Sequence, residues 1–333
     1  MPRHWVAFRL GHLGDVVLTT GVLEALGESR GWSFTVVTQK PWADVFSRHP
    51  HVTEVIALEA ENLNIGPFSA FCRRLAAEYS GAGLLDLHGS LRARLLALLW
   101  RGSVLRYPKM NLERRLFLAT GKRLYGERLR ASTVAQRYYM AAIPVGAPPP
   151  PPSALRPHIR LTGAELSEAR ARLGRLFSAP AVPLVLHPYA THALKAWPEP
   201  HWRKLVALLD EKDIPWIVLG KGEALFPGDA RDLSNATSLR ESCALIAHSR
   251  ALFTGDSGPM HLGAAVGVPV IALFGPTTRE WGFFPTGSRD VILESALPCR
   301  PCSLHGAAHC PRKGECLAAI APEQALEAIE GLV

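Results

Sequence analysis

The stretch that decides the fold is residues 255–261, which reads Gly-Asp-Ser-Gly-Pro-Met-His. An apolar run at 251–253 leads into it, a small-residue segment follows at 262–267, and a second apolar run covers 268–274. The pattern predicts a short buried strand, a tight polar turn, a helix and a second buried strand, which together form a βαβ unit. In an open α/β sheet the turn of such a unit lies at the carboxyl ends of the parallel strands, where ligands bind.

The residue types of this turn suit the recognition of anions and hydroxyl groups. Gly255 and Gly258 let the backbone approach a ligand closely, and the N–H groups at the helix start, with Pro259 in the first turn, can hold a phosphate. Asp256 adds a hydrogen-bond acceptor, and His261 adds a donor that switches with pH. A helix capped by Asp256 explains the same residues without any ligand. The turn by itself leaves both interpretations open.

The composition is that of a globular protein. The chain has 333 residues, enough for two domains, and its 48% hydrophobic and 20% charged content is not that of a disordered chain. It contains no apolar run of about 20 residues, the length that a membrane span needs. Arg9 interrupts the region where a signal peptide carries its apolar core. We therefore expect a cytoplasmic protein with six reduced cysteines.

The net charge of +8 is unevenly distributed. Residues 1–152 hold 19 Lys and Arg against 11 Asp and Glu, whereas residues 153–333 hold 18 of each. Between residues 92 and 130 there are eleven basic residues and two acidic ones. Such a face attracts phosphates, carboxylates or an anionic membrane surface. Charge alone does not exclude nucleic acid, but the basic stretch lacks a recognition motif, so we expect no nucleic-acid partner.

The first half of the chain alternates strand and helix patterns. A strand at 4–9 is followed by a glycine-bearing loop at 10–14 and by an amphipathic helix at 15–26 that opens on Asp15. Asp15 suits the helix N-terminus electrostatically, so capping is its simplest role. The loop is not a complete G-x-G-x-x-G, which makes a dinucleotide site weakly supported. The alternation predicts a parallel sheet with right-handed crossovers. Further strands are expected at 33–38, 54–58 and 83–87, and helices at 41–48, 67–79 and 91–100.

Residues 106–133 have a less clear periodicity, in which apolar side chains alternate with basic ones. This mixture is typical of a segment that faces a membrane or an acceptor. A solvated charged surface is the plainer interpretation, and both stay open.

A run of five prolines, Pro148 to Pro152, is the clearest boundary in the chain, because such a run forms a stiff extended spacer. It separates an expected N-terminal domain, residues 1–147, from a C-terminal domain, residues 153–333. The second half repeats the architecture of the first without an obvious repeat in sequence. Its elements are expected as helices at 164–177, 199–210 and 238–248, strands at 184–187 and 215–219, a loop at 188–195, and a glycine turn at 220–223.

Four of the six cysteines fall close together near the carboxyl end of the chain. In a reducing compartment, C-x2-C followed by two more thiols indicates a tetrathiolate metal site, with zinc as the default and iron as an alternative. The later spacings are looser than in common zinc ribbons, so free thiols and disulfides stay open. A closed four-sulfur site leaves no coordination position for catalysis. The four residues are Cys299, Cys302, Cys310 and Cys316.

The chain resembles glycosyltransferase family 9, the bacterial heptosyltransferases of the lipopolysaccharide inner core, and in particular its cysteine-bearing branch. The resemblance runs from about residue 5 to the end and keeps order and spacing throughout. It implies a GT-B architecture, with two Rossmann-like domains that face a central cleft, the donor mainly on the second domain and the acceptor mainly on the first. The matching segments are 9–17, 86–92, 195–202, 255–262 with 274–277, and the tail from 299 to 323.

The resemblance also implies roles for single residues. Asp15 would be the general base of an inverting transfer, and Lys195 would neutralise charge on the donor diphosphate as it leaves. Asp256 would bind sugar hydroxyls, and Arg92 would meet an acidic acceptor. The chain carries Ser257 where family donor loops often carry threonine, which keeps the hydroxyl. The remaining expected donor-binding residues are Thr191, Glu223, Thr237, Ser257, Gly258 and His261.

The implied function is transfer of a heptose from ADP-heptose to an anionic lipopolysaccharide-core or related acceptor. No cofactor is expected for catalysis, and the enzyme would be cytoplasmic or peripheral on the cytoplasmic face of the membrane. Two alternatives belong to other classes: a nucleotide-sugar epimerase or hydrolase on the same scaffold, and, much more weakly supported, a nucleic-acid-binding protein.

Overall fold

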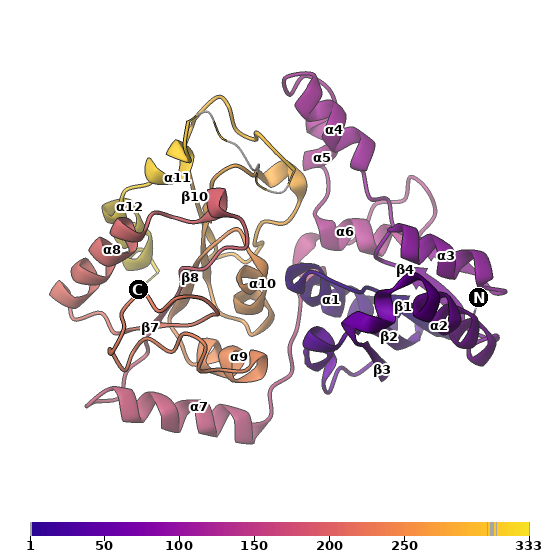
Figure 1. Cartoon of the computed structure of the whole chain (residues 1–333), viewed down its shortest axis with the longest axis horizontal. Helices are drawn as coiled ribbons and strands as arrows, with labels where there is room; N and C mark the ends of the chain where they lie inside the picture. Colours follow the sequence, from indigo (N-terminus) through magenta and orange to yellow (C-terminus); the bar gives the residue numbers. More distant parts are fainter. Residues whose placement is uncertain (1, 305, 307–309, 311, 333) are drawn as a thin grey trace. The chain divides into compact units, whose positions relative to one another are not determined.

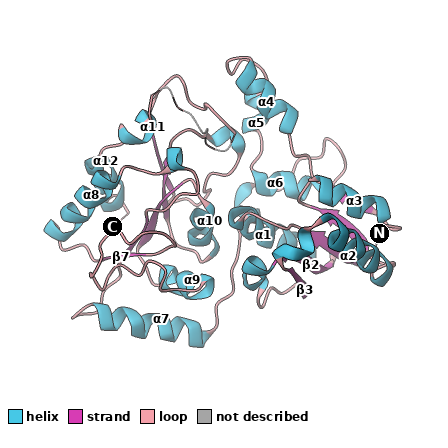
Figure 2. Ribbon diagram, viewed as in Figure 1, coloured by secondary structure: helices cyan, strands magenta, loops and turns pink. Residues whose placement is uncertain are grey.

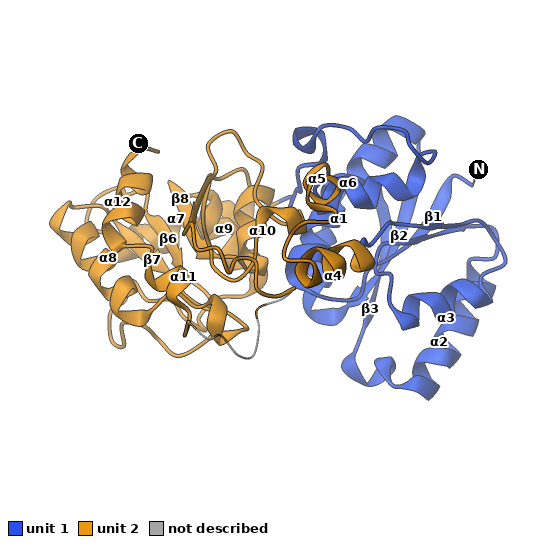
Figure 3. Cartoon of the chain, turned by 90° about the horizontal axis from the view of Figure 1, so that it is seen from above, with its two compact units in different colours: residues 1–110, 132–160 blue, residues 111–131, 161–333 orange. Residues whose placement is uncertain are grey.

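The computed structural model describes residues 2–304, 306, 310 and 312–332. The chain divides into two compact units (Figure 3). Unit 1 is Met1–Met110 with Ser132–Arg160, and unit 2 is Asn111–Ala131 with Leu161–Val333. This division differs from the expected domain boundaries in two places. The five prolines stay with unit 1, and a segment from the middle of the first half belongs to unit 2.

Unit 1 is built on a five-stranded parallel sheet with the order β3-β2-β1-β4-β5 (Figures 1 and 2). The central strand is buried along nearly its whole length, as a parallel strand covered on both faces requires. The strands are β1 (His4–Phe8), β2 (Ser33–Gln39), β3 (Val52–Leu58), β4 (Gly83–Asp86) and β5 (Val104–Arg106). The helices are α1 (Leu13–Arg30), α2 (Ile65–Glu78), α3 (Leu91–Leu99) and α6 (Val134–Tyr139), with the 3₁₀ turns η1 (Lys40–Phe46), η2 (Ala60–Leu63), η3 (Met140–Ala142) and η4 (Pro152–Leu155).

Unit 2 has a second parallel sheet with the order β10-β9-β8-β6-β7. The strands are β6 (Leu184–His187), β7 (Trp216–Val218), β8 (Ala251–Gly255), β9 (Val270–Phe274) and β10 (Val291–Glu294). The helices are α4 (Asn111–Ala119), α5 (Gly126–Arg130), α7 (Gly163–Leu176), α8 (Glu199–Glu211), α9 (Leu239–Ala247), α10 (Gly258–Ala265), α11 (Glu315–Ala318) and α12 (Pro322–Glu330), with the 3₁₀ turns η5 (Ala193–Lys195) and η6 (Arg279–Trp281).

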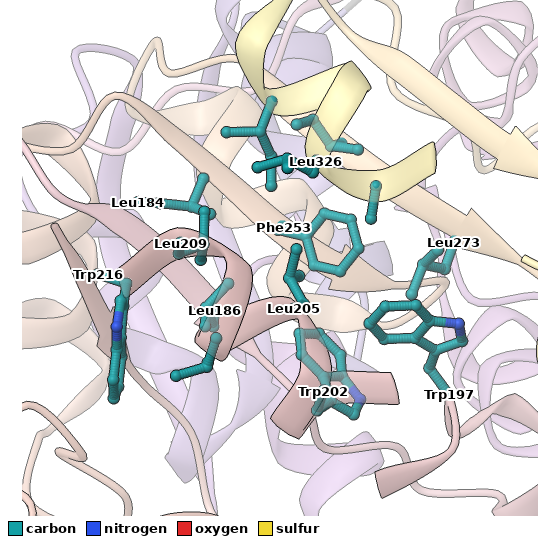
Figure 4. Close-up of a cluster of buried hydrophobic side chains, with 14 of the residues drawn as sticks. Leu184, Leu186, Trp197, Trp202, Leu205, Leu209, Trp216, Phe253, Leu273 and Leu326 are labelled. Atoms are coloured by element: carbon teal, nitrogen blue, oxygen red, sulfur yellow. The ribbon is translucent and has the colours of Figure 1, made fainter. Parts of the chain in front are cut away.

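The core of unit 2 shows how strand alternation covers both faces of its sheet. On β9, Ile271 and Leu273 join the cluster formed with α8 and α12, whose side chains include Trp202 and Leu326 (Figure 4). The intervening residues of β9 pack with Met260 of α10 in a separate cluster. Successive side chains of a strand point to opposite faces, so one apolar run supplies both cores.

Two expectations about secondary structure need correction. The segment expected as a helix at 41–48 forms the 3₁₀ turn η1, and Pro41 occupies one of the first two positions of this turn. The edge strands β5 and β10 were not predicted from the sequence. Both are short and only partly buried, so neither carries the apolar run that marks the central strands.

The segment of unclear periodicity forms α4 and α5, and polar contacts tie it to the rest of unit 2. Arg130 pairs with Glu280 at 2.6 Å, and Arg114 donates to the Trp281 carbonyl oxygen at 3.1 Å. Lys122 donates to carbonyl oxygens at positions 298 and 300. The basic stretch of the sequence is therefore divided between the two units. Among the described residues, no helix combines the length and the apolar character needed to cross a bilayer.

Each sheet has one position where the order of strand addition reverses. In unit 1 this switch point lies between β1 and β4, and in unit 2 it lies between β6 and β8. Ligands of open α/β sheets bind in the crevice that forms beyond the carboxyl ends of the strands at such a point. The loops that follow these four strands are therefore the first places to look for chemistry.

Candidate functional site

Asp15 lies just beyond β1, in the first turn of α1, where the backbone enters the helix through His12 at a φ of 64°. Its carboxylate receives one donor on each oxygen. The Arg9 guanidinium contacts Oδ2 at 2.6 Å, and the Tyr138 hydroxyl donates to Oδ1 at 2.5 Å. The side chain keeps 14% of its surface exposed. The carboxylate is therefore held in one orientation and still reaches solvent.

The two donors to Asp15 are themselves fixed. Arg9 donates to the carbonyl oxygens of Leu87 at 2.9 Å and Gly11 at 3.2 Å. Tyr138 is fully buried and packs edge-on against Tyr107, with ring centroids 4.8 Å apart. Burial raises the pKa of Tyr138 well above its ordinary value, so this hydroxyl stays protonated and acts as a donor. Burial disfavours the Arg9 charge, but Asp15 and the two tyrosines outweigh it and raise the pKa of Arg9.

The loop after β4 completes the switch point of unit 1. Asp86 is fully buried, and its carboxylate accepts from the backbone N–H groups of His88 at 3.0 Å and Gly89 at 2.8 Å, and from Arg106 at 2.8 Å. Burial and the charges of Arg9 and Lys109 lower the pKa of His88 to about 3. His88 is therefore neutral at physiological pH. Its buried Nδ1 has no hydrogen-bond partner among the described residues.

Asp256 follows β8 in unit 2 and binds two side chains from distant segments. Lys195 Nζ contacts Asp256 Oδ2 at 2.6 Å and the Asp256 carbonyl oxygen at 3.3 Å. Thr277, which follows β9, donates to the same Oδ2 at 2.5 Å. The Lys195 and Asp256 side chains are 16% and 12% exposed. The switch point of unit 2 thus carries one cation, one carboxylate and one hydroxyl close together.

The structure excludes one of the two interpretations of the 255–261 turn, and ligand binding there stays a prediction. Ser257, and not Asp256, is the N-cap residue of α10, and its side chain makes no capping hydrogen bond. The Asp256 carboxylate is directed instead to Lys195 and Thr277. At Gly255, a β-carbon would lie 3.3 Å from the Lys195 carbonyl oxygen, so the glycine permits the close approach of the two loops. The simple helix cap proposed as the alternative is therefore wrong.

A buried polar chain lies beneath this turn. Thr254 Oγ1 is 3.3 Å from His187 Nδ1 and 3.4 Å from Ser257 Oγ. Burial lowers the pKa of His187 to about 4, so His187 is neutral at physiological pH. His261 is buried within α10. With 4% of its surface exposed, His261 is better suited to a structural role in α10 than to direct contact with a ligand.

The other expected donor-binding residues also belong to unit 2, and Glu223 follows its glycine turn at 220–222. The Tyr189 ring packs against the 220–222 turn, and its hydroxyl donates to the Glu223 carbonyl oxygen at 3.0 Å. The Glu223 residue is exposed, as is Thr191. The Thr237 hydroxyl is 2.8 Å from that of Ser242 at the start of α9. The structure leaves the Glu223 and Thr191 side chains open to solvent, where a ligand could reach them.

Arg92 occupies the first turn of α3 and is already engaged. Its Nε and Nη2 donate to the Leu63 carbonyl oxygen at 3.2 and 3.0 Å. This contact joins the start of α3 to the end of η2, which precedes α2 in the chain. A role for Arg92 in acceptor binding stays a prediction.

The four clustered cysteines are not gathered into a metal site. All carry free thiols, with Cys299 and Cys302 exposed and Cys316 buried. Cys310 Sγ accepts from the Gly314 N–H at 3.5 Å. Among the described residues, no group of three or more His, Cys, Asp or Glu side chains is placed to hold a metal ion. Residues 305, 307–309 and 311, which surround Cys310, lie outside that part of the chain.

The sequence analysis did not identify three residues that contact the two site carboxylates: Arg9, Tyr138 and Thr277. Arg9 and Thr277 stand inside the motifs, but only the fold reveals which carboxylate each one contacts. Tyr138 lies 123 positions from Asp15 and carries no motif. It reaches the carboxylate because α6 packs against α1, a contact that no local pattern indicates.

Comparison with known proteins agrees with this arrangement. The family model for glycosyltransferase family 9 (heptosyltransferase) matches residues 83–309. The lipooligosaccharide heptosyltransferase 2 of Haemophilus influenzae is 31% identical over 156 residues, which are 42% of this chain and 43% of the relative. The match thus spans less than half the length of that curated relative.

Two solved structures share the fold. Escherichia coli ADP-heptose lipopolysaccharide heptosyltransferase II has a TM-score of 0.74 at 21% identity and covers 99% of this chain and 98% of its own. The iron-containing dodecameric glycosyltransferase TibC from enterotoxigenic E. coli has a TM-score of 0.61 at 13% identity, covering 99% of this chain and 76% of its own. The expected fold class, GT-B with two Rossmann-like units, is confirmed. The chain belongs to glycosyltransferase family 9, the heptosyltransferase family.

Proposed function

We propose that the protein is an inverting glycosyltransferase that moves a heptose from ADP-heptose to an anionic acceptor of the lipopolysaccharide-core type. The observation that carries this proposal is the Asp15 carboxylate, fixed by Arg9 and Tyr138 at the switch point of unit 1 and still open to solvent. Family membership and the ADP-heptose relative with the same fold support the donor.

Asp15 would act as the general base. Each carboxylate oxygen has about two lone pairs and receives one protein donor, so each keeps one for an acceptor hydroxyl. The acceptor oxygen would attack the anomeric carbon as its proton passes to Asp15, while the bond from that carbon to the ADP oxygen breaks. Attack from the side opposite the leaving group inverts the configuration. Arg9 and Tyr138 would hold the carboxylate aligned throughout.

The second unit would receive the leaving diphosphate. Negative charge builds on the departing ADP oxygen, and Lys195 together with the N–H groups of Ser257 and Gly258 would stabilise it. Lys195 is paired with Asp256 at 2.6 Å. Donor binding would let the lysine share its charge with the phosphates while Asp256 accepts hydrogen bonds from sugar hydroxyls. The Glu223 side chain would bind the ribose, Thr237 would border the base, Thr191 the phosphates, and His261 would hold the loop.

The experiment replaces Asp15 with alanine and measures transfer alongside ADP affinity. Transfer should be abolished while the dissociation constant for ADP stays nearly unchanged, because the base lies on a different unit from the nucleotide residues. Retained turnover would reject Asp15 as the base. Release of free or isomerised sugar by the wild-type protein without any acceptor would instead favour a hydrolase or epimerase.

We also propose a structural zinc or iron ion bound by Cys299, Cys302, Cys310 and Cys316. Thiolates are ligands that both metals accept, and TibC is an iron-containing protein with the same fold. The described residues do not form a metal-binding group, so no step of the transfer is assigned to an ion. Metal analysis of the purified protein, compared with a Cys302→Ser variant, tests the site. A metal content equal in both proteins would contradict it.

The proposed cellular place is the cytoplasm, with peripheral attachment to the cytoplasmic face of the membrane that holds the acceptor. The excess positive charge of the first 152 residues supports attachment to an anionic surface.

A further inference from the structure

Helix α3 of unit 1 carries apolar side chains where they contact little else. It packs on α2 (Figure 1), and its buried residues Ala93 and Leu96 belong to the same core cluster as side chains of α2. Leu91 is nevertheless 80% exposed, and Leu98 is 84% exposed. These two leucines are seven residues apart, two turns of helix, and therefore lie on one face. Two large aliphatic side chains so exposed on one short helix form a surface that requires an explanation.

The same face is basic. Arg94 stands one turn from each leucine, Arg101 follows the helix end, and both residues are exposed. The sequence contains no Asp or Glu from residue 87 through residue 112. Of the basic residues in that span, Arg106 is neutralised by Asp86. The leucines thus stand among arginines whose charges have no local acidic partner in the sequence.

A third apolar side chain extends this face. Ile65, at the start of α2, is 89% exposed. The Arg92 hydrogen bonds join the start of α3 to the carbonyl oxygen of Leu63, two residues before Ile65, so Ile65 and Leu91 stand in segments that are tied together. The acidic residues near this end are Glu61, which is exposed, and Glu59, which pairs with Lys40 at 2.5 Å. Positive charge prevails over the face as a whole.

We propose that this face, formed by Ile65, Leu91, Arg94, Leu98 and Arg101, docks unit 1 onto an anionic lipid bilayer. The aliphatic side chains would enter the boundary between headgroups and acyl chains, and the arginines would remain at the level of the lipid phosphates. The occupant follows from charge complementarity. A bilayer with anionic lipids offers apolar depth and negative charge over one surface, which is the combination that this face presents.

The placement deepens the proposed function and rests on it in one respect. Helix α3 begins five residues after β4, at the edge of the sheet where the Asp15 loop also lies. Arg9, which contacts Asp15, also donates to the carbonyl oxygen of Leu87, at the start of the segment that connects β4 to α3. A docked α3 would bring this edge of the sheet close to the bilayer surface. An acceptor anchored in the membrane could then reach Asp15 without leaving its lipid.

The experiment measures co-sedimentation of the full chain with vesicles of phosphatidylcholine alone and of phosphatidylcholine mixed with phosphatidylglycerol. We expect binding only to the mixed vesicles, with an affinity that falls as salt rises. The Arg94→Gln, Arg101→Gln double variant should bind about 30-fold more weakly, since each basic residue near an anionic surface contributes about a fivefold factor. The Leu91→Gln, Leu98→Gln variant should lose at least about tenfold.

The matched control is Leu112→Gln with Leu124→Gln. These leucines are also exposed, but they belong to the α4–α5 segment of unit 2, the region whose sequence pattern first suggested a membrane contact. This variant should bind vesicles like the wild type. Because every substituted side chain is exposed, the variants should keep the thermal unfolding midpoint of the wild type. A variant that does not is replaced by the single substitution Leu98→Gln.

Several outcomes would overturn the proposal. Equal binding to both vesicle types would show that negative lipid charge does not drive the docking. If only the Leu112 and Leu124 control lost vesicle binding, the membrane contact would lie on the α4–α5 segment instead. A dimer that the Leu91 and Leu98 substitutions dissociate, or tight salt-sensitive binding to RNA with none to vesicles, would assign the face to another partner. An Asp15→Asn variant should bind vesicles like the wild type, so the docking result stays interpretable even if the transferase proposal fails.

Discussion

Tyr138 offers a sharp test of the account, because a single oxygen atom links it to the proposed base. Its hydroxyl donates to Asp15 Oδ1 at 2.5 Å from a fully buried position. Tyr138→Phe removes that donor and keeps the ring that packs on Tyr107. Arg9 is less suitable for this purpose. It also holds the backbone at Gly11 and Leu87, so its replacement would disturb the loop itself.

The expected size of the effect follows from the charged hydrogen bond. A hydrogen bond to an ionised group contributes about 1.5–3 kcal/mol, and Asp15 is 14% exposed, so water replaces part of what is lost. We therefore take the lower end, about 1.5 kcal/mol. The lost bond holds the carboxylate in one orientation, and a general base must keep that orientation to reach the acceptor hydroxyl. The value of kcat/KM should therefore fall about tenfold, the rate factor that corresponds to this energy.

The assay is kcat/KM for transfer, measured together with the dissociation constant for ADP, which should stay unchanged because Tyr138 belongs to unit 1. The control is Tyr139→Phe. Tyr139 is also buried and belongs to the same helix, but its hydroxyl lies 3.4 Å from Ser29 Oγ, away from the carboxylate. Its kcat/KM should match that of the wild type. If kcat/KM of Tyr138→Phe also equals the wild-type value, Tyr138 does not act on the base and the reasoning is wrong.

The remaining predictions concern unit 2. Lys195→Gln should lower kcat/KM about 100-fold or more, because it removes the charge next to the leaving group, whereas Lys212→Gln, at an exposed pair with Glu330, should leave it unchanged. Steady-state kinetics of both variants tests this prediction. Equal kcat/KM values for the two variants would contradict a donor site at Lys195. For His187, burial lowers the pKa from 6.5 to about 4. The folded state therefore resists protonation, and the free energy of unfolding should fall by up to about 1.4 kcal/mol per pH unit as the pH drops from 6.5 toward 4. Chemical denaturation across this range should show that the free energy of unfolding depends less steeply on pH in His187→Gln than in the wild type. If the dependence is unchanged, His187 is not the source of the pH effect.

Much of the fold could be predicted from local pattern. The central strands β1, β6, β8 and β9 are apolar runs bounded by glycine or polar residues, and period and length identify them. Two of the four edge strands, β5 and β10, could not be predicted, because both are short and neither has a buried residue. The domain boundary was expected at the prolines, but the chain passes from unit 1 to unit 2 after Arg160, and residues 111–131 also belong to unit 2. Ion pairs such as Arg130–Glu280, which join residues 150 positions apart, hold this earlier segment in unit 2.

The candidate site, like the fold, was predictable from the sequence only in part. Asp15, Lys195 and Asp256 stand in recognisable motifs, so residue type and spacing were enough to select them. Their partners depend on long-range packing. Thr277 reaches Asp256 because β8 and β9 are neighbours in the sheet, and Tyr138 reaches Asp15 because α6 lies on α1. The expectation that the two units face a central cleft stays a prediction.

The central claim is that Asp15 accepts the proton of the acceptor hydroxyl. The most direct measurement is the single-turnover rate of Asp15→Asn with saturating donor and acceptor. The amide keeps the size of the carboxylate and one oxygen that can accept from Tyr138, but it cannot act as a base. The account predicts a loss of about 10²–10⁴-fold in the transfer step, with the donor dissociation constant unchanged. A rate within about tenfold of the wild type would contradict the claim, since general-base catalysis contributes more than that.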